Sequence, residues 1–150
     1  MKKARKAIVN FITKSAIFVK IFCLMKKIIT TPKAPAPIGP YNQAVMTGNM
    51  LFTSGQIAIN PETGQLEIGD IERETELVMQ NLSAILSAAG TSFKNVIKST
   101  IFISNMENFG KINAVYGRYF DEATAPARET VEVANLPKYV NVEISMIAVL

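Results

Sequence analysis

The hydrophobic pattern along the chain predicts one long helix near its middle. Mostly apolar side chains between residues 71 and 89 recur at spacings of 4, 3, 4, 3 and 4, which places them on one stripe of a helix. Asp70 is a good N-cap residue, and Gly90 is typical of a C-terminal end. We therefore expect a helix over residues 71–89. Its core-facing stripe consists of Ile71, Thr75, Val78, Leu82, Ile85 and Ala89.

A second helical pattern covers about residues 106–122, and Asn105 can cap it. Asn113 lies one position beyond the apolar stripe of this helix, and taken by itself it is interpreted as a surface asparagine. The stripe consists of Phe109, Ile112, Tyr116, Tyr119 and Phe120.

Alternating and β-branched runs predict strands around the two helices. Two runs, residues 41–47 and 50–56, flank Gly48-Asn49, a pair typical of a hairpin turn. Further strands are expected at an edge near residues 28–29 and at 57–59, 96–104, 128–134 and 140–149.

The last of these strands separates two faces of a sheet. Val140, Val142, Ile144, Met146 and Ala148 alternate with Asn141, Glu143, Ser145, Ile147 and Val149. Two helices and one mixed sheet indicate an α+β domain with both helices packed on one sheet face. The opposite face carries Val, Ile and Met side chains that need cover, which favours a homo-oligomer.

Three segments carry candidate chemistry. Arg128 follows a proline at the start of a strand, and its guanidinium suits a planar carboxylate; the simpler alternative is a salt bridge with Glu129 or Glu132. Glu143 lies in mid-strand on a face that becomes apolar, where a carboxylate is costly unless it is paired, functional or exposed at an edge. The proline-rich loop 32–40 is either a linker or an arm that places Tyr41 at a pocket edge.

Composition excludes several classes of function. The chain has no histidine and one cysteine, Cys23, so an internal disulfide and a thiolate metal cage are excluded and no metal is expected. The lack of disulfides fits a reducing compartment, and we expect a cytoplasmic protein. Residues 1–24 hold six of the 16 basic residues and no acid, so residues 25–150 carry 10 basic and 12 acidic residues, a net charge of −2. This body offers no basic stripe for nucleic acid.

Residues 1–24 differ from the single domain expected over residues 25–150. Lys14 and Lys20 interrupt the apolar run, which argues against a transmembrane helix. Three interpretations stay open: a basic amphipathic helix for a membrane surface, an organelle-targeting presequence, or a segment upstream of a true start at Met25. The last is favoured because the charge pattern changes there.

Several short motifs, in order and spacing, resemble the RidA (YjgF/YER057c/UK114) family over roughly residues 26–149. The motifs are Ala36–Tyr41, Phe52–Ile57, Pro61–Gly64, Asn113–Tyr116, Pro126–Arg128, Val131–Pro137 and Val142–Ile144. The resemblance implies a chorismate-mutase-like fold and a homotrimer with an internal β-barrel-like core and active sites at the subunit interfaces. It also implies an enzyme that needs no cofactor and hydrolyses the reactive enamines and imines 2-aminoacrylate and 2-iminobutanoate to 2-oxo acids and ammonia.

The resemblance also assigns roles to individual residues. Arg128 is expected to bind the substrate carboxylate, and Glu143 to position or activate the attacking water. The expected pocket residues are Tyr41, Ser54, Asn113, Gly39 and Thr130. Thr130 stands where the family often has cysteine, which argues against thiol chemistry. Two alternatives remain: a non-catalytic module that binds small carboxylates, and a ribonuclease or translation inhibitor, which the charge pattern disfavours.

Overall fold

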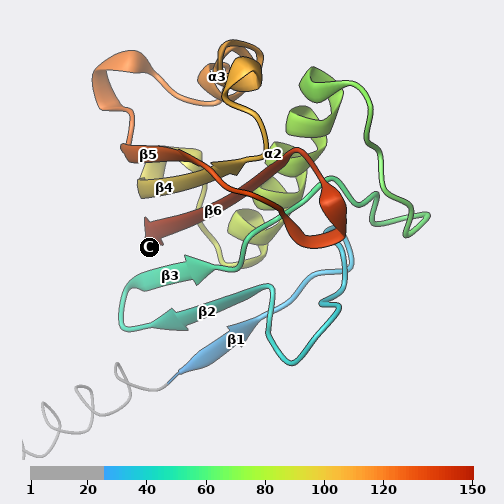
Figure 1. The fold of residues 1–150 in the computed structure, drawn as a ribbon. Helices are drawn as coiled ribbons and strands as arrows, with labels where there is room; N and C mark the ends of the chain where they lie inside the picture. The colour runs from blue at the N-terminus through green and yellow to red at the C-terminus, as the bar shows by residue number, and fades with distance from the viewer. Residues whose placement is uncertain (1–25) are drawn as a thin grey trace, which may run out of the picture.

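The computed structural model of the chain describes residues 26–150, which form one six-stranded sheet with two helices on one of its faces (Figure 1). The strand order is β1-β2-β3-β6-β4-β5; β4 and β5 run parallel, and every other neighbouring pair is antiparallel. The strands are β1 (Lys27–Ile29), β2 (Ala44–Thr47), β3 (Met50–Thr53), β4 (Val96–Ile103), β5 (Ala127–Glu132) and β6 (Val142–Val149). The mixed α+β architecture with both helices on one face is therefore confirmed, whereas the interpretations of residues 1–24 lie outside the described residues.

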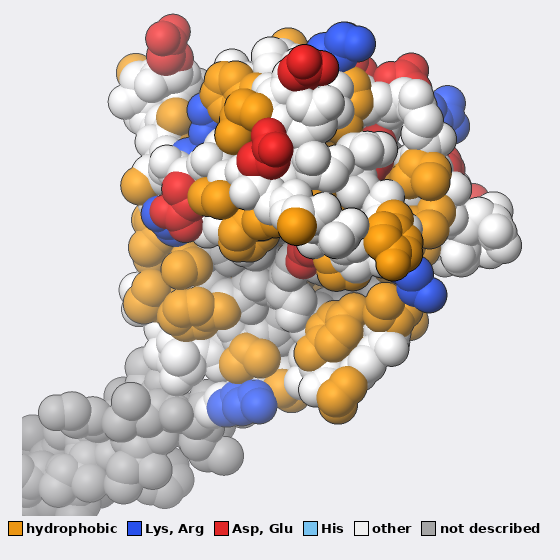
Figure 2. Space-filling view, viewed as in Figure 1, with side chains coloured by type: hydrophobic (Ala, Val, Ile, Leu, Met, Phe, Trp, Pro, Cys, Tyr) orange, Lys and Arg blue, Asp and Glu red, His pale blue; other side chains and the backbone are white. Residues whose placement is uncertain are grey.

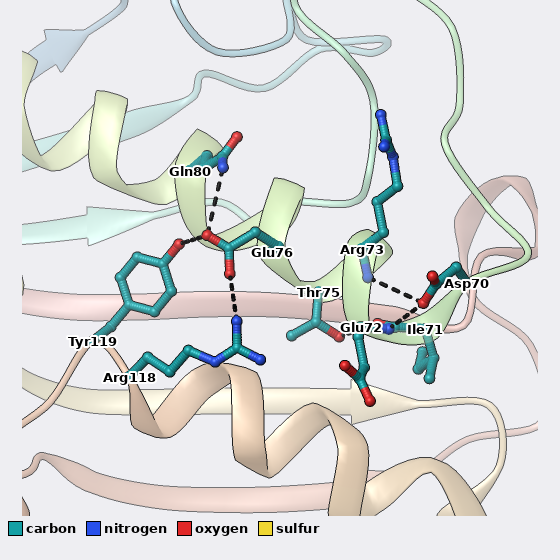
Figure 3. Close-up of polar contacts among 9 residues, drawn as sticks. All are labelled: Asp70, Ile71, Glu72, Arg73, Thr75, Glu76, Gln80, Arg118 and Tyr119. Carbon is teal, nitrogen blue, oxygen red and sulfur yellow. Dashed lines mark hydrogen bonds and ion pairs between the residues drawn. The ribbon is translucent and has the colours of Figure 1, made fainter.

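Helix α2 (Ile71–Ala88) forms where its apolar stripe predicted it. A carboxylate oxygen of Asp70 accepts hydrogen bonds from the backbone N–H groups of Glu72 (3.0 Å) and Arg73 (3.3 Å), as Figure 3 shows. An N-cap of this kind contributes about 1 kcal/mol. Gly90 ends the helix with a φ of +82°, a conformation that glycine adopts without strain.

Helix α3 (Phe109–Gly117) is shorter than the predicted 106–122. Asn105 does cap, but it caps a 3₁₀ turn (Met106–Asn108) that precedes the helix. At the other end, the helix stops at Gly117, and the side chains that follow hold the chain in place through contacts with α2. The Tyr119 hydroxyl bonds the Glu76 carboxylate of α2, and Arg118 lies 3.7 Å from the same carboxylate (Figure 3).

The predicted strand at residues 57–59 is wrong. Within this segment only Ile59 forms an isolated bridge, to Leu66, and the preceding residue, Gln56, forms another with Ile144. The Asn81 side chain on α2 takes the place of a strand partner, because its amide nitrogen donates to the carbonyls of Ile57 (3.3 Å) and Ile59 (3.0 Å).

The last strand starts at Val142 rather than at residue 140. A 3₁₀ turn (Pro137–Tyr139) comes first, and its residues Lys138 and Tyr139 both have positive φ, 58° and 55°. The hairpin strands are likewise shorter than predicted, and β5 covers 127–132 instead of 128–134.

A partly buried polar cluster around the buried Glu74 holds the start of β6. The Glu74 carboxylate on α2 accepts hydrogen bonds from the backbone N–H of Asn141 (2.7 Å) and from its side-chain amide (2.9 Å). The Asn141 amide oxygen accepts from the Ser104 hydroxyl (3.2 Å), and the Asn141 backbone carbonyl accepts from the Ser104 N–H (3.1 Å). Asn141 therefore has no unsatisfied polar group, and it sets the register of the strand that carries Glu143.

The two sheet faces have opposite character. Alternate residues of β6, from Val142 to Ala148, are buried beneath the helices, as the alternation predicted. The other face carries an apolar row of cross-strand partners: Ile28, Val45, Phe52 and Ile147. Phe52 is 40% exposed. Figure 2 shows hydrophobic side chains gathered in patches on the surface over the strands. The predicted apolar open face is therefore present on the described part of the chain.

Candidate active site in two parts

Glu143 lines a pocket of about 320 Å³ on the open side of the sheet. Its cross-strand partner is Phe102 rather than a buried residue, so its side chain points away from the helices. Within residues 26–150 its carboxylate has no hydrogen-bond or ion-pair partner. Burial raises the pKa of Glu143 above its ordinary value, because a charge is poorly solvated there. The pocket is lined by Ile38, Tyr41, Ser54, Gly55, Ile57, Pro137 and Glu143.

The proline-rich loop places Tyr41 at the edge of this pocket. The Tyr41 backbone N–H donates to the Gly39 carbonyl (2.8 Å), and the Tyr41 hydroxyl accepts from the Ile38 N–H (3.3 Å). Gly39 is thus part of the turn that orients Tyr41 and does not itself line the pocket. The loop is an arm of the pocket, and the linker alternative is wrong.

A buried glutamine holds the proline-rich loop in place. Through its side-chain amide, Gln43 donates to the carbonyls of Thr31 (2.9 Å), Ala34 (3.0 Å) and Pro35 (2.9 Å), and its oxygen accepts from the Thr31 N–H (2.6 Å). Sequence reasoning missed this residue, because a glutamine in a strand-like run gives no signal of such contacts.

Ser54 directly follows β3 and lines the pocket, while its contact with a substrate stays a prediction. Its hydroxyl donates to the Asn42 carbonyl (2.6 Å), and its N–H donates to the Gln43 carbonyl (2.9 Å). With its proton committed, the hydroxyl oxygen is left as an acceptor. Gly55, Ile57 and Pro137 are pocket residues that sequence reasoning did not single out.

Arg128 forms the second part of the site, on β5. Its Nη1 donates to the Asn113 side-chain oxygen of α3 (2.7 Å). Its guanidinium carbon lies 5.0 Å from the Tyr116 ring centroid and 5.8 Å from that of Phe109, both within cation–π range. One bond to a neutral amide and two ring faces hold the guanidinium in place without neutralising it.

The salt-bridge alternative for Arg128 is wrong. Glu129 instead binds Lys98 and accepts a hydrogen bond from the Thr100 hydroxyl (2.7 Å), and these contacts lower the pKa of Glu129. Glu132 accepts from the Met106 backbone N–H (2.7 Å). Neither carboxylate pairs with Arg128, so the guanidinium is available for an external anion.

Near Arg128, the hydroxyl groups of Tyr116 and Thr130 differ in their hydrogen bonding. The Tyr116 hydroxyl donates to Ser99 (2.9 Å), and burial raises the pKa of Tyr116, which keeps the ring neutral. The Thr130 hydroxyl is buried and has no hydrogen-bond partner within the described residues. Thr130 lies two residues after Arg128 on β5 and pairs with buried Ile101, so it shares the Arg128 side of the sheet, while its contact with a substrate stays a prediction.

The two parts of the site lie on opposite faces of the sheet. Arg128 is the register partner of Ser99, and Ser99 in turn pairs with buried Met146, so these side chains point toward the helices. Glu143 pairs with Phe102 and points the other way. The structure thus brings Asn113 to Arg128, and Tyr41 and Ser54 to Glu143, but it does not bring the two groups together within one chain.

Between residues 26 and 150, no three or more Cys, Asp or Glu side chains are grouped so that they could hold a metal ion. No helix in the same range is both long enough and apolar enough to cross a membrane.

Residues 31–150 match the family described as Endoribonuclease L-PSP. The chain belongs to this family, the RidA family that its motifs resemble. A RutC family protein of Synechocystis is 54% identical over 125 residues, which cover 83% of this chain and 96% of that protein.

Two further RidA relatives bear on chemistry and fold. The mouse protein named 2-iminobutanoate/2-iminopropanoate deaminase is 44% identical over 126 residues, or 84% of this chain and 93% of the mouse protein. The crystal structure of Escherichia coli TdcF with bound serine is 48% identical and superimposes with a TM-score of 0.78, covering 83% of this chain and 98% of TdcF. The family therefore includes a deaminase that is similar to this chain over most of its length.

Proposed function

We propose that the protein hydrolyses small 2-imino acids, the tautomers of 2-aminoacrylate and related enamines, to 2-oxo acids and ammonia. The observation that carries the proposal is the pair of complementary groups: a guanidinium free of carboxylates at Arg128, and a carboxyl group with a raised pKa at Glu143. The name of the mouse relative supports the same chemistry.

The Arg128 part suits the substrate carboxylate. A guanidinium offers parallel N–H donors that match the two oxygens of a carboxylate. Asn113 occupies one donor at 2.7 Å and leaves the others for the ligand. The faces of Tyr116 and Phe109 limit how the guanidinium can rotate.

The Glu143 pocket suits the addition of water to the imine carbon. A new C–O bond forms as the C=N π electrons move to nitrogen, and a proton leaves the water for the Glu143 carboxylate. The protonated carboxyl returns this proton to the nitrogen, which gives the neutral carbinolamine. The Glu143 carboxylate then takes the hydroxyl proton and passes it to the amino nitrogen, so that the C–N bond breaks, ammonia leaves and the carbonyl forms. A raised pKa favours both transfers, because the group must accept and donate near neutral pH.

The placement of the two parts on opposite faces bears on assembly. We propose that a site is completed when the Arg128 part of one copy meets the Glu143 pocket of the next, in a homotrimer whose open sheet faces turn inward. The apolar row from Ile28 to Ile147 supports this arrangement, because water would otherwise contact it.

A coupled assay tests the proposal. A threonine dehydratase generates 2-iminobutanoate, and the rate of 2-oxobutanoate formation is followed with and without the purified protein. We expect acceleration by the wild type and by Arg73→Ala, a control arginine on the helix face that pairs with Glu67. We expect Arg128→Ala to lose the acceleration while size-exclusion chromatography shows an unchanged oligomer. Full activity in Arg128→Ala would contradict the assignment.

The same preparations separate two other functions. The family description favours a ribonuclease, so RNA is incubated with the wild type and with Arg128→Ala, and cleavage that Arg128→Ala abolishes would replace the deaminase proposal. Binding of 2-oxobutanoate with no acceleration, unchanged in Glu143→Gln, would instead indicate a carboxylate-binding module.

A further inference from the structure

Gly55 lies in the pocket wall directly beside the Glu143 side chain. Its φ lies outside the left-handed region, so its position does not require glycine for a turn. The glycine is therefore explained by the limited room for a side chain at this position. The segment is also firmly held, because the next residue, Gln56, donates to the Ile144 carbonyl (2.8 Å) and accepts from the Ile144 N–H (3.1 Å).

A side chain at Gly55 would collide with the Glu143 side chain. A Cβ at this position would lie 1.8 Å from Glu143 Oε1, 2.7 Å from Cδ and 2.8 Å from Cγ. The optimal separation of non-bonded carbon atoms is about 3.5–4.0 Å. The three nearest atoms all belong to Glu143, so the collision involves the carboxylate side chain above all.

Gly39, Gly110 and Gly117 do not show this pattern. A Cβ at Gly39 would meet the Tyr41 ring at 3.5 Å, an ordinary contact. A Cβ at Gly117 or at Gly110 would meet no atom within 4 Å apart from the helix's own nearby backbone. The close approach is therefore a property of the Gly55–Glu143 pair rather than of glycines in general.

We infer that Gly55 is a positioning residue: the space left by its missing side chain sets where the Glu143 carboxylate lies in the pocket. The inference rests on the proposed deaminase function for its catalytic consequence. The backbone pairing of Gln56 with Ile144 keeps this space at a fixed distance from β6, whereas the pocket leaves an open side into which a displaced carboxylate can swing.

The substitution Gly55→Ala in the full chain tests the inference. The added methyl group moves the carboxylate toward the open side of the pocket, and a misplacement of about 1 Å is expected to lower the rate by about 10²-fold. Gly117→Ala is the matched control, because it adds the same methyl group in open space and is expected to keep the wild-type rate.

A second readout follows the Glu143 carboxyl group itself. Its carbon resonance is titrated by NMR in the wild type and in Gly55→Ala, with Tyr41 as the other titratable group that lines the pocket. We expect the pKa of Glu143 to fall toward its ordinary value in Gly55→Ala, because the displaced carboxylate is better solvated. This measurement needs no substrate, so it still judges the role of Gly55 if the wild type proves to have no deaminase activity.

The inference is overturned by a titration of Glu143 that is the same in the wild type and in Gly55→Ala, whatever the rate. If Gly55→Ala does not fold, a double-mutant comparison decides. Glu143→Ala removes all three colliding atoms, so adding Gly55→Ala to it is expected to lower the midpoint of thermal unfolding far less than adding Gly55→Ala to the wild type. Equal losses in the two backgrounds would also overturn the inference.

Discussion

The Arg128 part and the Glu143 pocket reach their chemistry by opposite means. Arg128 is held by what it touches, an amide oxygen and two aromatic rings. The pKa of Glu143 is instead raised by burial alone, because within the described residues its carboxylate has neither a counter-charge nor a hydrogen bond. A permanent cation suits anchoring of a carboxylate, whereas a carboxyl group that gains and loses a proton suits catalysis.

Mixing variants is the strongest test of this division. Arg128→Ala and Glu143→Gln are each expected to lose at least about 10²-fold in rate. If the two parts meet between copies, co-expression of the two variants restores about a quarter of the wild-type rate, because each interface has one chance in two of receiving each intact part. The rate per site in the purified mixed oligomer checks this. A rate no higher than that of either variant alone would show that the parts do not meet between copies.

A negative charge placed beside Arg128 tests whether this residue anchors the substrate carboxylate. Asn113→Asp puts a carboxylate where the amide oxygen now accepts at 2.7 Å, so it competes with the substrate for the guanidinium. We expect KM to rise about tenfold or more, with a smaller change in kcat, since the lost interaction is ground-state binding. Asn113→Ala serves as the control and is expected to raise KM less. A large fall in kcat with unchanged KM would mean that Asn113 acts on the chemistry instead.

A smaller effect concerns stability and comes from the Glu143 pocket. The folded pKa of Glu143 lies above its ordinary value of 4.5, so between these pKa values the native state binds more protons than the unfolded state. Stability therefore falls as pH rises through this window. Glu143→Gln cannot ionise, and we expect its thermal midpoint to exceed that of the wild type at pH 7, with the difference closing below about pH 4.5.

Glu129→Gln is the matched control for this stability effect and has the opposite sign. Contacts with Lys98 and Thr100 lower the pKa of Glu129, so its ionised form stabilises the fold above the unfolded pKa, and that stability is lost as pH falls through the folded pKa. We expect Glu129→Gln to lower the midpoint at neutral pH. Calorimetry of both variants from acid to neutral pH measures the two trends, and changes of the same sign would contradict the interpretation.

The local hydrophobic pattern predicted much of the fold. Its errors arise where contacts between residues far apart in the sequence decide the structure. The α2 stripe and the alternation of β6 were correct because each depends on residues a few positions apart. The end of α3 was wrong because Glu76, 43 residues before Tyr119, binds the hydroxyl that lies past the helix. The false strand at 57–59 has the same cause, since Asn81 of α2 satisfies its carbonyls.

The candidate site divides in the same way. Arg128, Glu143 and Tyr41 could be singled out because charge, strand position and the proline-rich approach are visible in the sequence. The role of Gly55 could not be predicted from the sequence. Only the structure shows that a Cβ at this position would lie 1.8 Å from Glu143 Oε1, so that no side chain fits there. The separation of the two parts likewise follows from strand register, which the sequence alone does not specify.

The Gln43 contacts have a consequence for the speed of ligand capture. One side chain collects the carbonyls of Thr31, Ala34 and Pro35, in a loop whose prolines offer no N–H groups for a sheet. The wall that carries Tyr41 is therefore ordered before any ligand arrives, and binding loses little conformational entropy there. We expect association to be limited by diffusion and orientation rather than by closure of this loop, which would suit the short-lived imines of the proposed function.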